Sequence, residues 1–195
     1  MNFVAHQLLS FRNPEIQIGN LYGEVVRGKD FLRFEGDRQK GILLHRQIDS
    51  FTDSHPAVKN SSQIFHERYG KYSPVIVDIL YDYILISNWE NFSEESYEEF
   101  VADCYLLFQK HFSEFPPRLK FIVQHLLEQD WFRNYQTLAG IQQTLSGISQ
   151  RSKFPNNIAS AVEEMLIYKD VLEKDFHVFF PEIRNHCKSF LNSLR

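Results

Sequence analysis

The chain has 195 residues, of which 43% are hydrophobic and 15% aromatic, and its formal net charge is −4. This length fits one domain with a substantial core. The acidic balance argues against broad binding to nucleic acid, which requires many basic contacts to phosphates. Two distant cysteines, Cys104 and Cys187, do not favour a disulfide scaffold or a thiolate zinc site. No segment approaches the ~18 apolar residues of a membrane span. The first residues lack a basic region followed by a long apolar run, so we expect no signal peptide. We therefore expect a cytoplasmic protein without membrane contacts.

The first half of the chain contains several sequence signals for the start of a helix. An Asn-Pro pair at 13–14 and a Ser-Pro pair at 73–74 each place proline in the first turn of a helix. We predict helices over residues 14–27, 39–51, 55–69 and 73–89. Gly19 and Gly23 lie four residues apart in the first of these, which would allow another helix to approach closely.

Similar signals continue in the second half. Ser93 is the predicted cap of a helix with an acidic first turn, and Pro155-Asn156 is the predicted start of a long helix that Pro181 either kinks or restarts. The predicted helices span residues 94–112, 118–128, 138–150 and 156–180. Alternating strand patterns are missing. The sequence thus predicts an all-α fold with a single compact domain over residues 1–195.

A polar stripe is predicted on the helix over residues 39–51. His45, Asp49 and Asp53 follow one another at intervals of four residues, which places them on one helix face. Carboxylates and a neutral imidazole are common ligands of manganese or magnesium. The alternative is structural: Asp49 would pair with Arg46 or Arg27, and Asp53 would end one helix or cap the next.

Asp78 and Asp82 form a second acidic pair, within the very apolar helix predicted over residues 73–89. Two carboxylates on one face of a buried helix repel each other unless one is protonated or a cation lies between them. A shared divalent metal ion would relieve this repulsion. Ion pairing with Arg27, Arg33 or Arg46 is the alternative.

Two further positions are ambiguous from the residues alone. Glu24 and Arg27 lie three residues apart and would pair across a helix, or else act as a general base and a phosphate-binding guanidinium. His6 stands alone in an apolar stretch, where a hydrogen-bonded core histidine is the more common interpretation.

Several motifs together resemble the bacterial acyl carrier protein phosphodiesterase family over essentially the whole chain. The segments are MNFVAH at 1–6, GNLYGEVVRG at 19–28, GILLHRQIDSFTD at 41–53, VDILYDY at 77–83, NW at 88–89, PPR at 116–118, Trp131, LSGISQR at 145–151 and FFP at 179–181. The first three are highly specific in combination.

The resemblance implies an all-helical fold distantly similar to the HD phosphohydrolases, and an enzyme that removes 4′-phosphopantetheine from holo-acyl carrier protein. It also implies a divalent ion, most often manganese, with magnesium as a second choice. The matching positions are His6, His45, Asp49, Asp78 and Asp82, which are therefore the expected metal ligands. Glu24 or a neighbouring carboxylate would position or deprotonate a water molecule, and Arg27 and Arg46 would balance the charge of the phosphate.

Two positions depart from the family pattern. Glu24 stands where aspartate is usual, and Tyr83 stands where histidine is usual. Tyrosine cannot replace an imidazole as an acid or base near neutral pH. Two alternatives therefore stay open: a weakened or inactive member that acts as a binding protein, and a hydrolase of another small phosphoester.

Overall fold

The start signals read from the sequence begin several of the observed helices. The computed structural model describes residues 2–194. The Asn13 side chain accepts hydrogen bonds from the N–H groups of Glu15 and Ile16 and so caps α2, and Pro14 is the first residue of that helix. The helices are α1 (Phe3–Leu8), α2 (Pro14–Gly23), α3 (Gly36–Ser54), α4 (Pro56–Tyr69), α5 (Ser73–Ser87), α6 (Tyr97–His111), α7 (Pro117–Glu128), α8 (Trp131–Asn134), α9 (Leu138–Arg151), α10 (Ala161–Ile167) and α11 (Lys169–Ser193). Short 3₁₀ turns join some of them.

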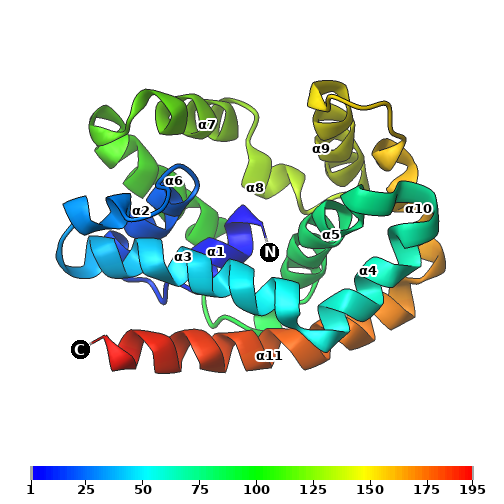
Figure 1. Ribbon diagram of the computed structural model, residues 1–195, viewed down its shortest axis with the longest axis horizontal. Coiled ribbons are helices and arrows are strands. Elements are labelled where there is room, and N and C mark those ends of the chain that lie inside the picture. The colour runs from blue at the N-terminus through cyan, green and yellow to red at the C-terminus, as the bar shows by residue number, and fades with distance from the viewer. Residues whose placement is uncertain (1, 195) are drawn as a thin grey trace.

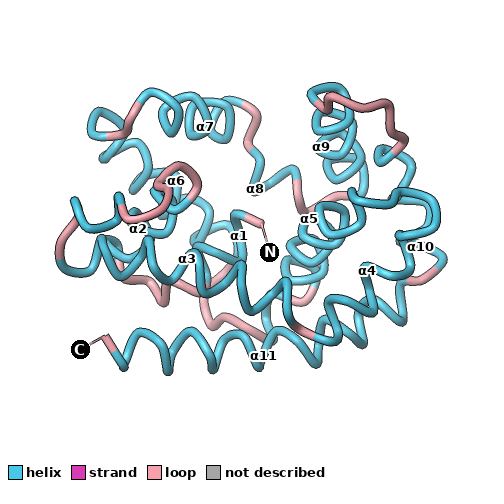
Figure 2. Tube along the Cα trace, in the orientation of Figure 1, coloured by secondary structure: helices cyan, strands magenta, loops and turns pink. Residues whose placement is uncertain are grey.

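The described residues contain no strand, which confirms the all-α prediction (Figure 2). Helix α11 runs along one side of the whole molecule and packs against α3, α4 and α5, while α1 lies in the centre (Figure 1). Aromatic residues fill the core. The ring of Tyr81 meets those of Phe176 and Phe179 with centroids 5.3 and 5.6 Å apart. None of the helices within residues 2–194 is long and apolar enough to cross a membrane.

Some predicted boundaries were wrong. The expected helix over 14–27 ends at Gly23, and α1 was not predicted at all. Helix α6 begins after Ser96 rather than Ser93, because the Ser96 hydroxyl and the Glu99 carboxylate form a reciprocal capping box.

The long helix predicted from residue 156 was also wrong. Residues 152–157 are not helical, and α10 and α11 are separate helices. Hydrogen bonds between side chains and the local backbone, such as that from Ser160 Oγ to the Asn157 carbonyl at 2.9 Å, compete with helix formation in this segment. Helix α11 then continues through Pro181, whose side chain faces solvent while Phe180 and Ile183 on either side are buried.

Helices α2 and α3 pack unusually closely, as the predicted role of Gly19 requires. A Cβ atom on Gly19 would lie 2.1 Å from the Arg38 carbonyl oxygen, and one on Gly41 would lie 2.3 Å from the Ile16 carbonyl oxygen. These backbone atoms cannot move aside without separating the two helices. The glycines therefore fix the spacing between α2 and α3.

We expect Gly41→Ala to lower the free energy of unfolding by about 1–3 kcal/mol, because overpacking costs this much and the obstacle is backbone. Urea denaturation followed by circular dichroism would measure the change. Gly147→Ala is the matched control, since the nearest atom to a Cβ there belongs to the flexible Arg151 side chain, at 3.3 Å. If both variants behave alike, the close approach of α2 and α3 does not limit stability.

Candidate metal centre

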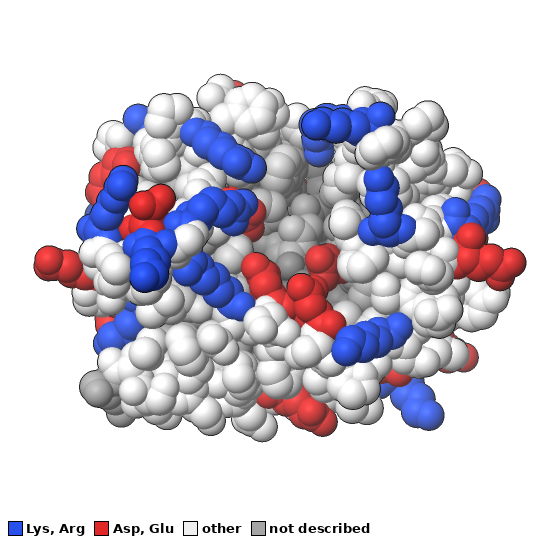
Figure 3. Space-filling view, viewed as in Figure 1, with Lys and Arg blue, Asp and Glu red and all other residues white. Residues whose placement is uncertain are grey.

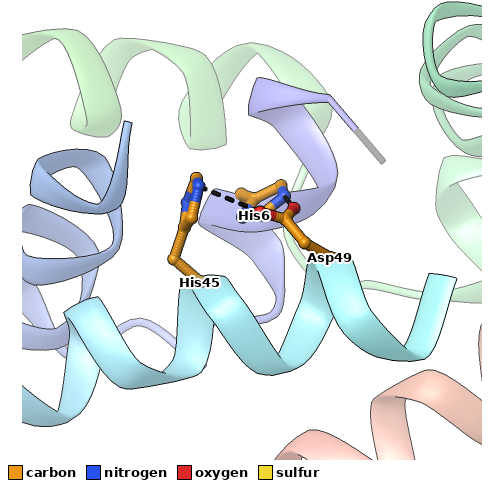
Figure 4. A group of neighbouring side chains, drawn as sticks. All are labelled: His6, His45 and Asp49. Atoms are coloured by element: carbon orange, nitrogen blue, oxygen red, sulfur yellow. Dashed lines mark ion pairs between the residues drawn. The ribbon is translucent and has the colours of Figure 1, made fainter. Parts of the chain in front are cut away.

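Three side chains from two helices converge at the centre of the molecule. His6 lies on α1, and His45 and Asp49 lie one turn apart on α3 (Figure 4). The Nε2 atom of His6 is 3.3 Å from one carboxylate oxygen of Asp49, and the Nε2 atom of His45 is 3.3 Å from the other. The two histidines are buried, and the Asp49 side chain is 50% exposed. These three residues are the predicted ligands that the structure brings together.

A glycine of α2 makes room for this arrangement. A Cβ atom on Gly23 would lie 2.3 Å from Cγ of His45. Any larger residue at this position would displace the imidazole. The same close packing that joins α2 to α3 therefore also places the His45 ring beside His6, where the two ring centroids are 4.4 Å apart.

Asn20 orients both imidazoles, a role that the sequence did not reveal. Its Nδ2 group donates hydrogen bonds to the His6 carbonyl at 3.0 Å and to Ser10 Oγ at 3.1 Å. Its Oδ1 atom therefore accepts from Nδ1 of His6 at 2.9 Å and from Nδ1 of His45 at 3.0 Å. An amide at the centre of an otherwise apolar helix segment was the available signal, since a buried amide requires hydrogen-bond partners.

The donor set fits a divalent cation. Because both Nδ1 atoms donate to Asn20, both Nε2 atoms carry lone pairs, and these lone pairs face a carboxylate. Burial, followed by the influence of His6, lowers the pKa of His45 to about 3. Near neutral pH this ring therefore carries no second proton that would relieve the repulsion between its Nε2 lone pair and the Asp49 carboxylate. Two imidazole nitrogens and a carboxylate are suitable ligands for a divalent metal ion.

Glu24, which is expected to act beside the ion, lies near this group. Glu24 follows α2 directly and is half-buried. Burial raises its pKa, and the negative charge of Asp49 adds to this effect, while His6, Arg27 and Arg118 oppose it. Burial alone would raise the pKa of Asp49, but the neighbouring imidazoles lower it, which favours the ionised carboxylate that a metal ligand requires.

The predicted arginines differ in their positions. Arg27 is exposed, and its guanidinium donates to the Glu24 carbonyl at 3.0 Å. Arg46 donates to the Val26 carbonyl at 3.4 Å and lies over the ring of Phe31. Arg118, like Arg27, acts to lower the pKa of Glu24. The roles of Arg27 and Arg46 toward a phosphate stay predictions.

Asp82 has partners that neither the cation nor the arginine interpretation anticipated. It is fully buried on α5 and accepts hydrogen bonds from the backbone N–H groups of Asn2, Val4 and Ala5 at 3.3, 2.9 and 3.4 Å. It thus caps the N-terminus of α1, where N–H groups lack partners within the helix. Asp82 supports the helix that carries His6, and its role as a ligand stays a prediction.

Asp78 and Asp53 lie outside the group of three. Asp78 is half-buried on α5, and Asp53 is exposed at the end of α3. The pKa of Asp53 is raised by burial and then by Asp78, so their carboxylates lie within electrostatic reach of each other. Figure 3 shows acidic side chains gathered along the lower edge of a central hollow, with Lys and Arg side chains elsewhere around its margin.

The fold and this group define an all-helical protein with a candidate metal centre. A model of the family described as acyl carrier protein phosphodiesterase matches residues 1–183, and the chain belongs to this family. This confirms the resemblance read from the sequence.

Relatives of the same description match along nearly their whole length. The chain is 28% identical to one from Enterobacter sp. (strain 638) over 190 residues, covering 97% of this chain and 98% of the relative. It is 28% identical to one from Yersinia enterocolitica over 96% of this chain and 98% of the relative. A protein from Salmonella paratyphi A is 27% identical, over 94% and 95% of the two chains. No solved structure matches the chain.

Proposed function

We propose that this protein is a divalent-metal-dependent phosphodiesterase that removes 4′-phosphopantetheine from holo-acyl carrier protein. The observation that supports the proposal is the convergence of His6 Nε2, His45 Nε2 and the Asp49 carboxylate, whose ligand atoms lie close enough together to share one cation. Manganese is the ion that we expect, with magnesium as the alternative. When bound, such an ion would polarise phosphoryl oxygens and lower the pKa of water.

The remaining roles fall to side chains around this group. Asn20 holds both imidazoles with Nε2 beside the Asp49 carboxylate, so these three residues would hold the ion. Glu24, with its raised pKa, accepts the proton of the attacking water. As water adds to phosphorus, the bond from phosphorus to the serine oxygen breaks, and the proton passes to that oxygen. Arg27 supplies positive charge near the phosphate.

The test is incubation with holo-acyl carrier protein and manganese, followed by mass spectrometry of the carrier. We expect conversion to apo-carrier and release of 4′-phosphopantetheine. Glu24→Gln should lower kcat by about 100- to 10,000-fold, the usual loss on removing a general base. Glu67→Gln, on the exposed face of α4, is the control and should retain activity.

An unchanged carrier mass with several divalent ions and high protein concentration would contradict the proposal. The next experiment would then ask whether the two departures from the family pattern, Glu24 and Tyr83, cause the lack of activity. If Glu24→Asp combined with Tyr83→His gains activity that the unaltered protein lacks, the chain is a binding protein that has lost turnover. Hydrolysis of small phosphate esters without cleavage of the carrier would instead identify a different substrate.

A further inference from the structure

A small cavity lies beside the candidate metal centre and has no role in the chemistry described above. Its volume is about 200 Å³, and it lies between the start of α1 and the helices α8 and α9. Asn2 lines the cavity, and its carbonyl accepts a hydrogen bond from the His6 N–H group at 3.2 Å. The cavity therefore begins one helical turn, or about 5.4 Å along α1, from a predicted ligand.

The walls of the cavity suit a neutral chain with amide groups. Phe3 and Trp131 form an aromatic wall, with ring centroids 5.6 Å apart. Gln143 and Thr144 contribute an amide and a hydroxyl from α9. Arg151 is the only charged residue among the described residues of the lining, which holds no carboxylate and so does not favour a cationic ligand.

The size of the cavity limits the ligand further. Pockets for small molecules usually measure about 300–1,000 Å³. A cavity of about 200 Å³ favours a slender chain over a nucleotide or another ring system. A phosphate held at the metal centre would place the first atoms of its ester chain beside this cavity.

We infer that this cavity binds the amide-bearing chain attached to the phosphate. The inference rests on the proposed function, under which that chain is the pantetheine arm of the carrier. The chain would lie along Phe3 and Trp131, and its amide groups would exchange hydrogen bonds with Gln143 and Thr144. The site would thus recognise the arm that is removed, separately from the group that cleaves the ester.

The fluorescence of Trp131 can report ligand binding, because this side chain is half-buried in the cavity wall. Pantetheine itself, which lacks the phosphate, is the probe. We expect saturable binding to the full-length protein with a change in Trp131 fluorescence. Gly147→Leu would fill the cavity and should weaken binding at least about tenfold. Ser146→Leu, at the adjacent position of α9 outside the lining, is the matched control and should bind as the unaltered protein does.

A second variant covers the case in which Gly147→Leu does not fold. Gln143 is exposed, so Gln143→Leu should fold normally, and it should weaken pantetheine binding by about 2- to 10-fold through the loss of hydrogen bonds. No binding of pantetheine at millimolar concentration would overturn the inference. So would equal changes in Trp131 fluorescence with apo- and holo-carrier, which would assign the cavity to the polypeptide.

The inference and the proposed function fail separately. If pantetheine binds as expected but the holo-carrier mass never changes, the cavity is assigned and the hydrolytic proposal is wrong. If the carrier is cleaved but Gly147→Leu retains the KM of the unaltered protein, the hydrolytic proposal stands and the cavity does not bind the arm.

Discussion

The His45→Ala variant should lose the thermal stabilisation that manganese gives the protein. An ion at one hundred times its Kd stabilises the folded state by about 2.7 kcal/mol. For a chain of this length that corresponds to a rise in Tm of roughly 5–10 °C. The unaltered protein should show this rise, and a chelator should reverse it. In His45→Ala the Tm should be the same with and without manganese, because one of the converging nitrogen ligands is missing.

Removal of a buried imidazole also disturbs packing, so the comparison is made within each variant, with and without the ion. His66→Ala, on the exposed face of α4, is the control and should keep the full manganese response. Differential scanning calorimetry measures both quantities. A manganese response that survives in His45→Ala, or that is missing from the unaltered protein, would contradict the metal centre.

Asp82→Ala should destabilise the fold by about 2–4 kcal/mol, measured by urea denaturation. The substitution leaves backbone donors at the start of α1 buried without acceptors, and each unsatisfied donor costs about 1–3 kcal/mol. Burial of the carboxylate offsets part of its favourable hydrogen bonding. Glu67→Ala, which alters only an exposed carboxylate, is the control and should change stability by less than about 0.5 kcal/mol.

The contribution of Asp82 to folding stability should decrease as pH rises. Burial raises the pKa of Asp82 to about 6, above its ordinary value of 3.8. The folded state therefore binds the proton more tightly than the unfolded state. The contribution of Asp82 to stability falls as pH rises from about 4 to 6, by roughly 3 kcal/mol in total, and is constant above.

Asp82→Asn does not titrate, so the stability difference between the unaltered protein and this variant should shrink over the same pH range. A constant difference would contradict the raised pKa. The manganese response of Asp82→Asn also tests the remaining prediction for this residue. A lost response would make Asp82 a ligand as well as a cap, and a retained response would leave it a cap of α1 only.

The parts of the site that could be predicted from sequence are those fixed by local geometry. The spacing of His45 and Asp49 gives one helix face whatever else packs against it, and Gly19 indicates a close helix contact. His6 could be placed only through the family resemblance, because nothing local says that α1 lies against α3. The partners of Asp82 depend on how α5 packs against the start of α1. The periodicity of the sequence does not predict this contact.

The missed role of Asn20 has a similar cause. Its neighbours on α2 are apolar, and a single amide among them is equally consistent with a cap, a turn or a core hydrogen bond. Only the packing of both α1 and α3 against α2 gives its oxygen two imidazole partners. The prediction of one helix over residues 156–180 failed for a different reason, because hydrophobic periodicity persists across the break between α10 and α11.

The converging ligands lie within the first 49 residues, whereas the aromatic and amide walls of the cavity come mainly from α8 and α9, between residues 131 and 151. The two regions meet at the start of α1, where Asn2 and Phe3 line the cavity. Under the proposed function, substitutions in α9 would therefore alter which chain is held without moving the imidazoles. Such a division would let natural variation or a directed library change substrate choice and leave the proposed hydrolytic group intact, and α9 is where that library should be built.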